Sequence, residues 1–218
     1  MSLTLDGKTA TITGVSGSTL GIKSIQTFSS AGTYTWTKPS GITKIRVYVT
    51  GGGAGGGSHN TDDAQGGGGA AGTAIKDIDV TNVSSVTVTV GAGSAGSAGN
   101  TSAGGTWGGI SSFGSYCSAM GGRPVVTWGI GGFGGWGIGG DINIRGGNAH
   151  TGNIDGYANS ERGGTGGASY WGSGGRGGTN WMTRQNGRAP GSGGGGTQVN
   201  SSNQGGSGAP GIVVVEEY

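Results

Sequence analysis

The sequence is poor in cysteine, proline and charged residues. A single cysteine, Cys117, cannot form an internal disulfide, and four prolines are too few for a collagen-like chain. Charged residues make up 10% of the chain and the formal net charge is +2, with no run of basic residues, so we expect no nucleic-acid partner. No apolar stretch approaches the roughly 20 residues that span a bilayer, which predicts no membrane insertion.

The first residues, 1–8, lack the basic and apolar regions of a signal peptide. We therefore expect the protein to be made in a cytoplasm and to reach any outside location by another route.

Glycine is what the chain has in excess, at 59 of 218 residues, where about 7% is usual. Glycine adds no side chain to a core and loses the most backbone freedom on folding, so the chain must either be disordered or use glycine as a packing element. A low net charge combined with six Trp and six Tyr is not typical of disorder. We therefore expect an ordered chain.

Alternating apolar and polar residues predict β-strands near both ends of the sequence. Residues 85–90 read Ser-Val-Thr-Val-Thr-Val, a clean two-residue period. Residues 212–215 form a continuous apolar run, which suits a strand covered on both faces. No segment has a helical period with caps, so we expect almost no α-helix. Further strands are predicted at 9–13, 22–28, 33–37, 44–50 and 73–80.

Between residues 91 and 211 the period changes from two to three, as in the spacing of Gly131, Gly134 and Gly137. A three-residue period belongs to the extended left-handed helix of the polyproline II type, whose backbone groups point outward and must be paired. We therefore predict polyglycine II helices that pack side by side, joined by N–H···O bonds and Cα–H···O contacts.

One of these predicted helices carries a ridge of large side chains, because Ile130, Phe133 and Trp136 fall three residues apart. We expect the ridge to pack on a neighbour, since aromatic side chains favour burial. An exposed binding stripe is the alternative.

Together these patterns predict an all-β fold class with polyglycine II helices. Strands within 24–90 and 212–217 are expected to form a small β-sandwich or sheet platform, which carries a packed stack of glycine-rich left-handed extended helices from residues 91–211. Residues 1–23 are set apart as an N-terminal attachment or assembly segment, and residues 24–218 form the glycine-rich domain.

Three stretches of the chain carry distinctive motifs. Residues 27–39 read TFSSAGTYTWTKP, residues 45–53 read IRVYVTGGG, and residues 208–216 read GAPGIVVVE. In this order they resemble the glycine-rich domain of bacteriophage tail fibres and tail-tip adhesins, over residues 24–218. The resemblance implies packed polyglycine II helices with variable segments between them that contact the host surface.

The resemblance also implies a virion location and a set of partners. These are other virion proteins and a bacterial surface glycan or outer-membrane protein. We expect a homotrimer, because closed symmetry hides strand edges that otherwise invite aggregation. A single adhesin at a fibre tip is the alternative.

The sequence offers few parts for catalysis. Its two histidines, His59 and His150, are far apart and lie in polar, glycine-flanked stretches. His59 with Asp62 and Asp63 makes only a weak metal-binding pattern, which we interpret as a polar loop. There is no Walker loop, and no feature pairs the carboxylates for glycoside hydrolysis. We predict a protein that is not an enzyme and needs no cofactor or metal.

Several segments interrupt the glycine pattern with aromatic and planar polar side chains, the types that dominate recognition surfaces. We expect these side chains to bind the receptor, with the alternative that Trp171 and Trp181 pack on glycine faces. The candidate residues are His59, Asn60, Asp62, Asp63, His150, Tyr157, Tyr170, Trp171, Trp181, Met182 and Arg184.

Three functions are compatible with these observations. The expected one is a phage fibre or adhesin protein that recognises a bacterial host surface receptor. The second is a purely structural virion component, such as a capsid decoration or a fibre connector. The third is a polysaccharide depolymerase.

Overall fold

The computed structural model describes residues 2–5, 10–13, 21–58, 64–99, 104–125, 129–153, 162–179, 182–198 and 204–218. Within these residues the regular elements are all β-strands, without a helix. The strands are β1 (Ser2–Leu5), β2 (Ala10–Thr13), β3 (Ser24–Phe28), β4 (Gly32–Thr37), β5 (Lys44–Thr50), β6 (Thr73–Asp79), β7 (Ser85–Val90), β8 (Ser111–Phe113), β9 (Cys117–Ala119), β10 (Gly137–Ile138), β11 (Ile142–Ile144) and β12 (Ile212–Glu217).

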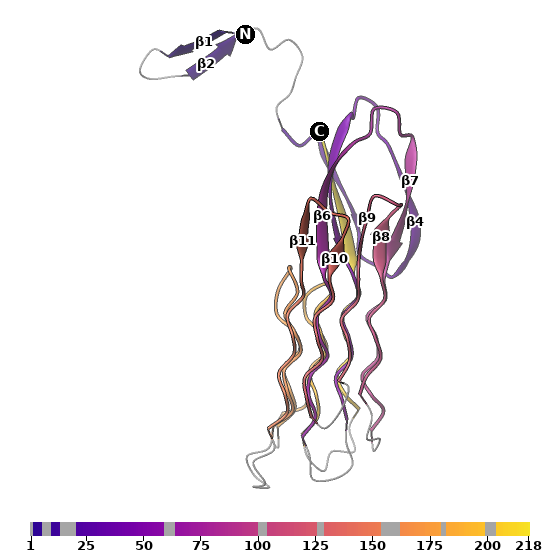
Figure 1. Ribbon diagram of the computed structural model, residues 1–218, viewed down its shortest axis with the longest axis vertical. Helices are drawn as coiled ribbons and strands as arrows, with labels where there is room; N and C mark the ends of the chain where they lie inside the picture. Colours follow the sequence, from indigo (N-terminus) through magenta and orange to yellow (C-terminus); the bar gives the residue numbers. More distant parts are fainter. Residues whose placement is uncertain are drawn as a thin grey trace.

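Two five-stranded sheets make up one half of the molecule, which we call the sheet half (Figure 1). Their strand orders are β10-β9-β8-β7-β4 and β11-β6-β5-β12-β3, and β1 pairs with β2 separately. All of the strand pairs are antiparallel. The closing strand β12 therefore lies inside its sheet, between β5 and β3, although it comes last in the sequence.

The core of the sheet half follows from the two-residue period of its strands. In β5, Ile45, Val47 and Val49 are fully buried, while the residues between them face the other side. The valines of β7 enter the same core from the second sheet. Trp36 and Phe113 meet there with their ring centroids 5.8 Å apart. The alternation read from the sequence thus predicts the correct inward faces.

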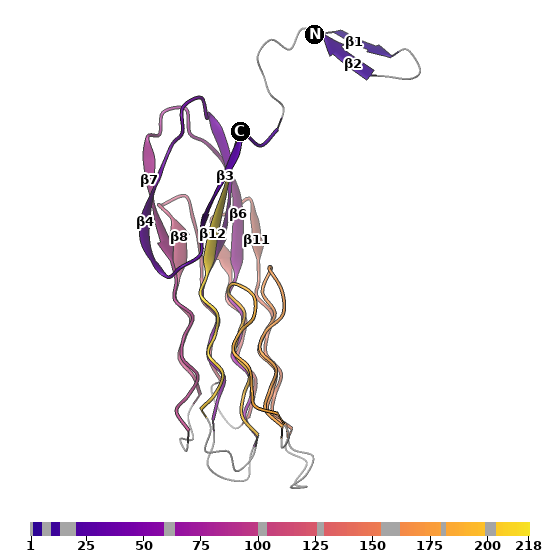
Figure 2. The same ribbon diagram turned by 180° about the vertical axis from the view of Figure 1, so that it is seen from behind.

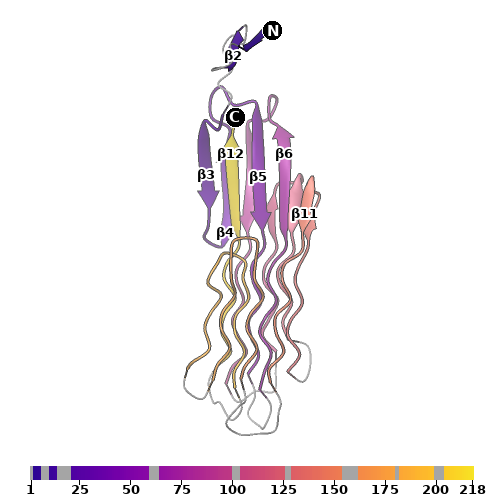
Figure 3. The same cartoon turned by 90° about the vertical axis from the view of Figure 1, so that its left-hand side faces the viewer.

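Glycine-rich segments continue from one end of the sheets and run side by side away from them, as Figures 1 and 3 show. Figure 2 shows one of them leading directly into β12. They contain no strand among their described residues, only the isolated bridges Ser169–Gly172 and Thr179–Met182. We call these twelve segments the glycine bundle: 51–58, 64–72, 91–99, 104–110, 120–125, 129–136, 145–153, 162–169, 172–179, 182–189, 191–198 and 204–211.

Backbone hydrogen bonds join each segment of the bundle to its neighbours. Three segments, 51–58, 64–72 and 191–198, are bonded to one another and lie at the centre. For example, Ala54 N donates to Gly69 O over 3.0 Å, and Gly68 N donates to Gly194 O over 2.9 Å. The six segments bonded to 64–72 are 51–58, 120–125, 129–136, 145–153, 162–169 and 191–198. The bundle is therefore a hydrogen-bonded array in which a central segment is surrounded on all sides.

The segments lie too close together for most side chains. A Cβ atom added at Gly68 would lie 2.2 Å from the carbonyl oxygen of Ala54, and one added at Gly193 would lie 1.8 Å from that of Gly68. Both distances are far inside van der Waals contact, so only glycine fits at these positions. Gly178 differs, because the nearest atom to its added Cβ would be 3.4 Å away.

The all-β prediction is confirmed, and the predicted strands correspond to β2 to β7 and β12. The sequence did not predict β1, which has four residues, or β8 to β11, which have two or three each. Strands this short show no measurable two-residue period.

Candidate functional site

Positive charge is concentrated in the glycine bundle. Six arginines lie there, whereas the described carboxylates, at Asp77, Asp79, Asp141, Glu216 and Glu217, all belong to the sheet half. The ion pairs between described residues also lie in the sheet half, where Asp77 binds Lys44 and Arg46 and Lys76 binds Asp141. The bundle arginines are Arg123, Arg145, Arg162, Arg176, Arg184 and Arg188, and the remaining acidic residues of this region, Asp62, Asp63, Asp155 and Glu161, lie outside the described residues.

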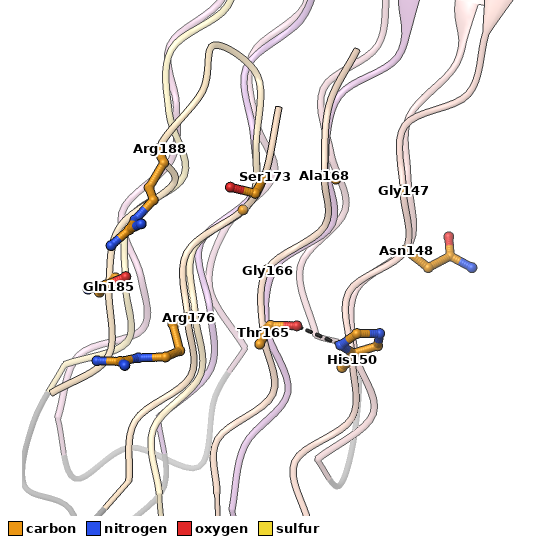
Figure 4. A pocket seen from close by; sticks show the side chains of 11 residues that line it. Gly147, Asn148, His150, Thr165, Gly166, Ala168, Ser173, Arg176, Gln185 and Arg188 are labelled. Atoms are coloured by element: carbon orange, nitrogen blue, oxygen red, sulfur yellow. Dashed lines mark hydrogen bonds between the residues drawn. The ribbon is translucent and has the colours of Figure 1, made fainter. Parts of the chain in front are cut away.

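A groove with a volume of about 500 Å³ lies on the flank of the bundle (Figure 4). Four segments contribute to it: 145–153, 162–169, 172–179 and 182–189. Glycines and Ala168 form part of its lining, which leaves backbone exposed there. The polar side chains along it are Asn148, His150, Thr165, Ser173, Arg176, Gln185 and Arg188.

The three-residue period brings these side chains to one face. Ser173 and Arg176 are three residues apart on one segment, and Gln185 and Arg188 are three apart on the next. A hydrogen bond of 2.6 Å joins Nδ1 of His150 to Oγ1 of Thr165 across two segments. The groove is therefore lined by two guanidinium groups, an imidazole, two hydroxyls and two amides, and by no described carboxylate.

Of the predicted site residues that the structure describes, His150 alone lines this groove. Tyr170 and Trp171 lie instead at the sheet end of the bundle, where their rings pack on Tyr48 at centroid distances of 6.3 and 6.1 Å. Trp171 is half-buried, and its Nε1 donates a hydrogen bond of 2.9 Å to Oγ1 of Thr50. Burial raises the pKa of the Tyr48 phenol, and the nearby Glu216 carboxylate raises it further. Trp171 thus joins the bundle to β5, and Tyr170 remains 48% exposed beside it.

Met182 and Arg184 lie toward the opposite end of the bundle. Met182 is exposed and exchanges backbone hydrogen bonds with Thr179. Arg184 is half-buried, and its Nε has no hydrogen-bond partner among the described residues. The other predicted site residues, His59, Asn60, Asp62, Asp63, Tyr157 and Trp181, lie outside the described residues.

The bundle segment ends that border undescribed residues and the C-terminus lie at opposite ends of the molecule. The segment ends that flank the undescribed stretches of the bundle lie together, at the end remote from the sheets (Figures 1 and 2). The C-terminus lies at the other end, and Lys23 N donates a hydrogen bond of 2.7 Å to Glu217 O beside it. The chain therefore enters and leaves the sheet half at one end, and the segment ends that border residues 59–63 and 154–161 lie at the other, whereas Tyr170 and Trp171 lie next to β5 (Figure 1).

The ridge of Ile130, Phe133 and Trp136 is exposed, at 48%, 41% and 39%, so the expectation that it packs on a neighbour is wrong. Its segment lies at the edge of the array, and the glycines take the inward positions that a ridge would need. Arg123 lies between two indoles, 5.0 Å from the ring centroid of Trp107 and 4.8 Å from that of Trp136. Arg145 lies 5.1 Å from the ring centroid of Trp136 as well. No local pattern in the sequence indicates this Trp–Arg row, because its members come from four different segments.

The described residues contain no group of three or more His, Cys, Asp or Glu that would hold a metal ion. In the same ranges there is no helix with the length and apolar character of a membrane span.

A protein-family match extends over both the sheet half and the glycine bundle. The sequence matches the family described as a glycine-rich domain over residues 28–218, from the end of β3 through the bundle to the last residue. No curated protein matches the chain. Because the match covers most of the sheet half and the whole array of glycine-rich segments, the protein belongs to the glycine-rich domain family.

Proposed function

We propose that the segments of the glycine bundle are polyglycine II helices. The period of their hydrogen bonds supports this. Gly51, Ala54 and Gly57 all donate to segment 64–72, whereas Gly53 and Gly56 donate to segment 204–211. A helix with three residues per turn directs successive residues to different neighbours and has no internal hydrogen bonds. Its backbone groups are then satisfied by the surrounding helices.

We further propose that the protein is a bacteriophage fibre or adhesin component that recognises the surface of a bacterial host. One observation carries the proposal: the segment ends that border residues 59–63 and 154–161, two of the stretches that interrupt the glycine pattern, lie at one end of the molecule, while the chain enters and leaves the sheet half at the other (Figure 1). A hydrogen-bonded bundle between them is a stiff spacer. It would hold the interrupting stretches away from an attachment point, on a rigid scaffold, as binding loops commonly are.

On this proposal the protein acts by binding, without catalysis, as part of a virion. Its partners would be a surface glycan or outer-membrane protein on one side and other virion proteins on the other. We propose a homotrimer as the assembled state, which light scattering of the purified protein measures directly.

Binding of fluorescently labelled protein to a panel of bacterial strains tests the proposal. We expect saturable binding to one strain, competed by unlabelled protein. Replacing residues 59–63 or 154–161 by a glycine-serine linker of equal length should abolish it without lowering the unfolding temperature. A linker replacement within residues 14–20 is the matched control and should leave binding intact. A folded protein that binds no strain would favour the purely structural virion role, and release of reducing ends from a host glycan would favour a depolymerase.

A further inference from the structure

The flank groove has the composition of a site for a negatively charged ligand. We infer that it binds an anionic sugar, meaning a saccharide that carries a carboxylate or a phosphate group. The inference names the class of ligand that the receptor recognition proposed above would involve. It rests on that proposal only in placing the ligand on a cell surface.

The charge of the groove comes from Arg176 and Arg188, both exposed. Neither forms an ion pair or a side-chain hydrogen bond with a described residue, so their guanidinium donors face solvent. A guanidinium binds carboxylate or phosphate oxygens through two parallel N–H···O bonds, which is the strongest common form of anion recognition by a side chain. Two such groups on adjacent segments favour an anion over a neutral ligand.

The surroundings of the groove strengthen this preference. The described part of the bundle carries six arginines and no carboxylate, so no fixed negative charge competes for the groove there. The sheet half, by contrast, pairs its cations with Asp77 and Asp141. A surface with one sign of charge raises the local concentration of oppositely charged ligands.

The shape of the groove indicates a ligand larger than an ion. Its volume of about 500 Å³ falls within the range of small-molecule sites, about 300–1,000 Å³. Gly147, Gly166 and Gly174 contribute backbone to its lining, which gives a ring a surface free of side chains to lie against. Thr165, Ser173 and Gln185 supply hydroxyl and amide groups beside the two arginines. Hydroxyl groups of a sugar need such donors and acceptors, and a bare anion does not.

Calorimetric titration of the full chain tests the inference with matched pairs of probes. One pair is sialyllactose and lactose, which differ by the acidic sugar. The other pair is glucose 6-phosphate and glucose. We expect at least one anionic probe to bind, with affinity that falls as salt is raised, and both neutral probes to fail. Binding by only one anionic probe identifies the carboxylate or the phosphate as the group recognised. If neither anionic probe binds, or if lactose binds as tightly as sialyllactose, the inference is wrong.

Substitutions locate the site. Arg176→Gln and Arg188→Gln should each weaken binding of the anionic probe by about tenfold, the effect of losing one charge-assisted hydrogen-bonding group. Arg145→Gln removes an exposed arginine of the same bundle outside the groove and is the control, expected to bind as the wild type does. Equal affinity in all four proteins would place the site elsewhere and overturn the inference. Inorganic phosphate that binds as tightly as glucose 6-phosphate would show that the sugar adds nothing, which would also overturn it.

The failure of this inference is separable from that of the proposed function. If strain binding is lost on replacement of residues 59–63 or 154–161 while no anionic sugar binds, the groove assignment fails and host recognition stands. If an anionic sugar binds in the groove but no strain is recognised, the groove assignment stands and host recognition fails.

Discussion

The indole of Trp36 donates a hydrogen bond of 2.7 Å to Oε1 of Glu217, and both residues are fully buried. Trp36 belongs to β4 in one sheet, and Glu217 belongs to β12 in the other. Gln26 Nε2 donates to the same oxygen over 2.7 Å, and Ser24 Oγ donates to the second carboxylate oxygen. A buried carboxylate is costly unless its oxygens accept hydrogen bonds. Glu217 therefore joins β3, β4 and β12 through one polar centre.

Glu217→Gln should lower the free energy of unfolding by about 2 kcal/mol. The amide oxygen can still accept from Trp36 and Gln26, but both hydrogen bonds lose the carboxylate charge, and the Ser24 hydroxyl must turn from donor to acceptor for the new NH₂ group. Urea unfolding followed by circular dichroism measures the change. Glu216→Gln, next in the strand but only partly buried, is the control and should cost less than about 1 kcal/mol. Equal losses in the two variants would show that the buried hydrogen bonds add nothing.

Gly193→Ala should destabilise the bundle strongly, because the added Cβ would lie 1.8 Å from the carbonyl oxygen of Gly68. Neither backbone can retreat without breaking hydrogen bonds to its other neighbours, so we expect a loss of about 3 kcal/mol, at the upper end of overpacking effects. Gly178→Ala is the matched control, since its nearest atom would lie 3.4 Å away. It should change the free energy of unfolding by less than about 1 kcal/mol. The comparison fails if both variants unfold at the same urea concentration.

The contrast between these two glycines shows where sequence reasoning stops. A three-residue spacing predicts that glycines face neighbouring segments, but Gly193 and Gly178 look alike in the sequence. Which one lies at the centre depends on how twelve segments are arranged around 51–58, 64–72 and 191–198. The strand pattern of residues 85–90 carried more information, because alternation alone determines which face of β7 enters the core.

The groove could be predicted only in part for the same reason. The spacing of Gln185 and Arg188 puts both on one face of their segment. Arg176 joins them because segments 172–179 and 182–189 are neighbours, as the hydrogen bond from Gln185 N to Arg176 O shows. His150 comes from a segment farther back in the chain, and no local pattern links it to these arginines. Which segments lie next to each other is a property of the tertiary structure, and it cannot be read from a single sequence.

Trp171→Ala should destabilise the junction between bundle and sheets by about 2 kcal/mol, since it removes a half-buried ring packed on Tyr48 and the hydrogen bond to Thr50. Trp171→Phe retains much of the packing and should cost about half as much. Thermal unfolding measures both. Strain binding by the Phe variant then separates packing from recognition. Wild-type binding would assign Trp171 to the junction alone, whereas loss of binding by the Phe variant at a temperature where it is fully folded would support its place among the receptor-binding residues.

Cys117 should be unreactive in the folded protein. Its side chain is 5% exposed, and burial raises the pKa of the thiol to about 11, whereas an unfolded cysteine ionises near about 8.5. The reactive species is the thiolate, so an aromatic disulfide reagent at mildly alkaline pH should label the native protein slowly and the urea-unfolded protein at once.

The same shift makes stability depend on pH with a definite sign. The folded state keeps the Cys117 proton more tightly than the unfolded state, so the contribution is fully present below a pH of about 8.5. It is lost progressively as the pH rises from there toward the folded pKa of about 11. Tyrosines and lysines titrate in the same window, and Cys117→Ala isolates the thiol because it leaves them in place. The wild type should lose more stability than Cys117→Ala as the pH is raised through this window. Parallel curves for the two proteins, or equally fast labelling of folded and unfolded wild type, would show that the thiol is not held in a buried, protonated state.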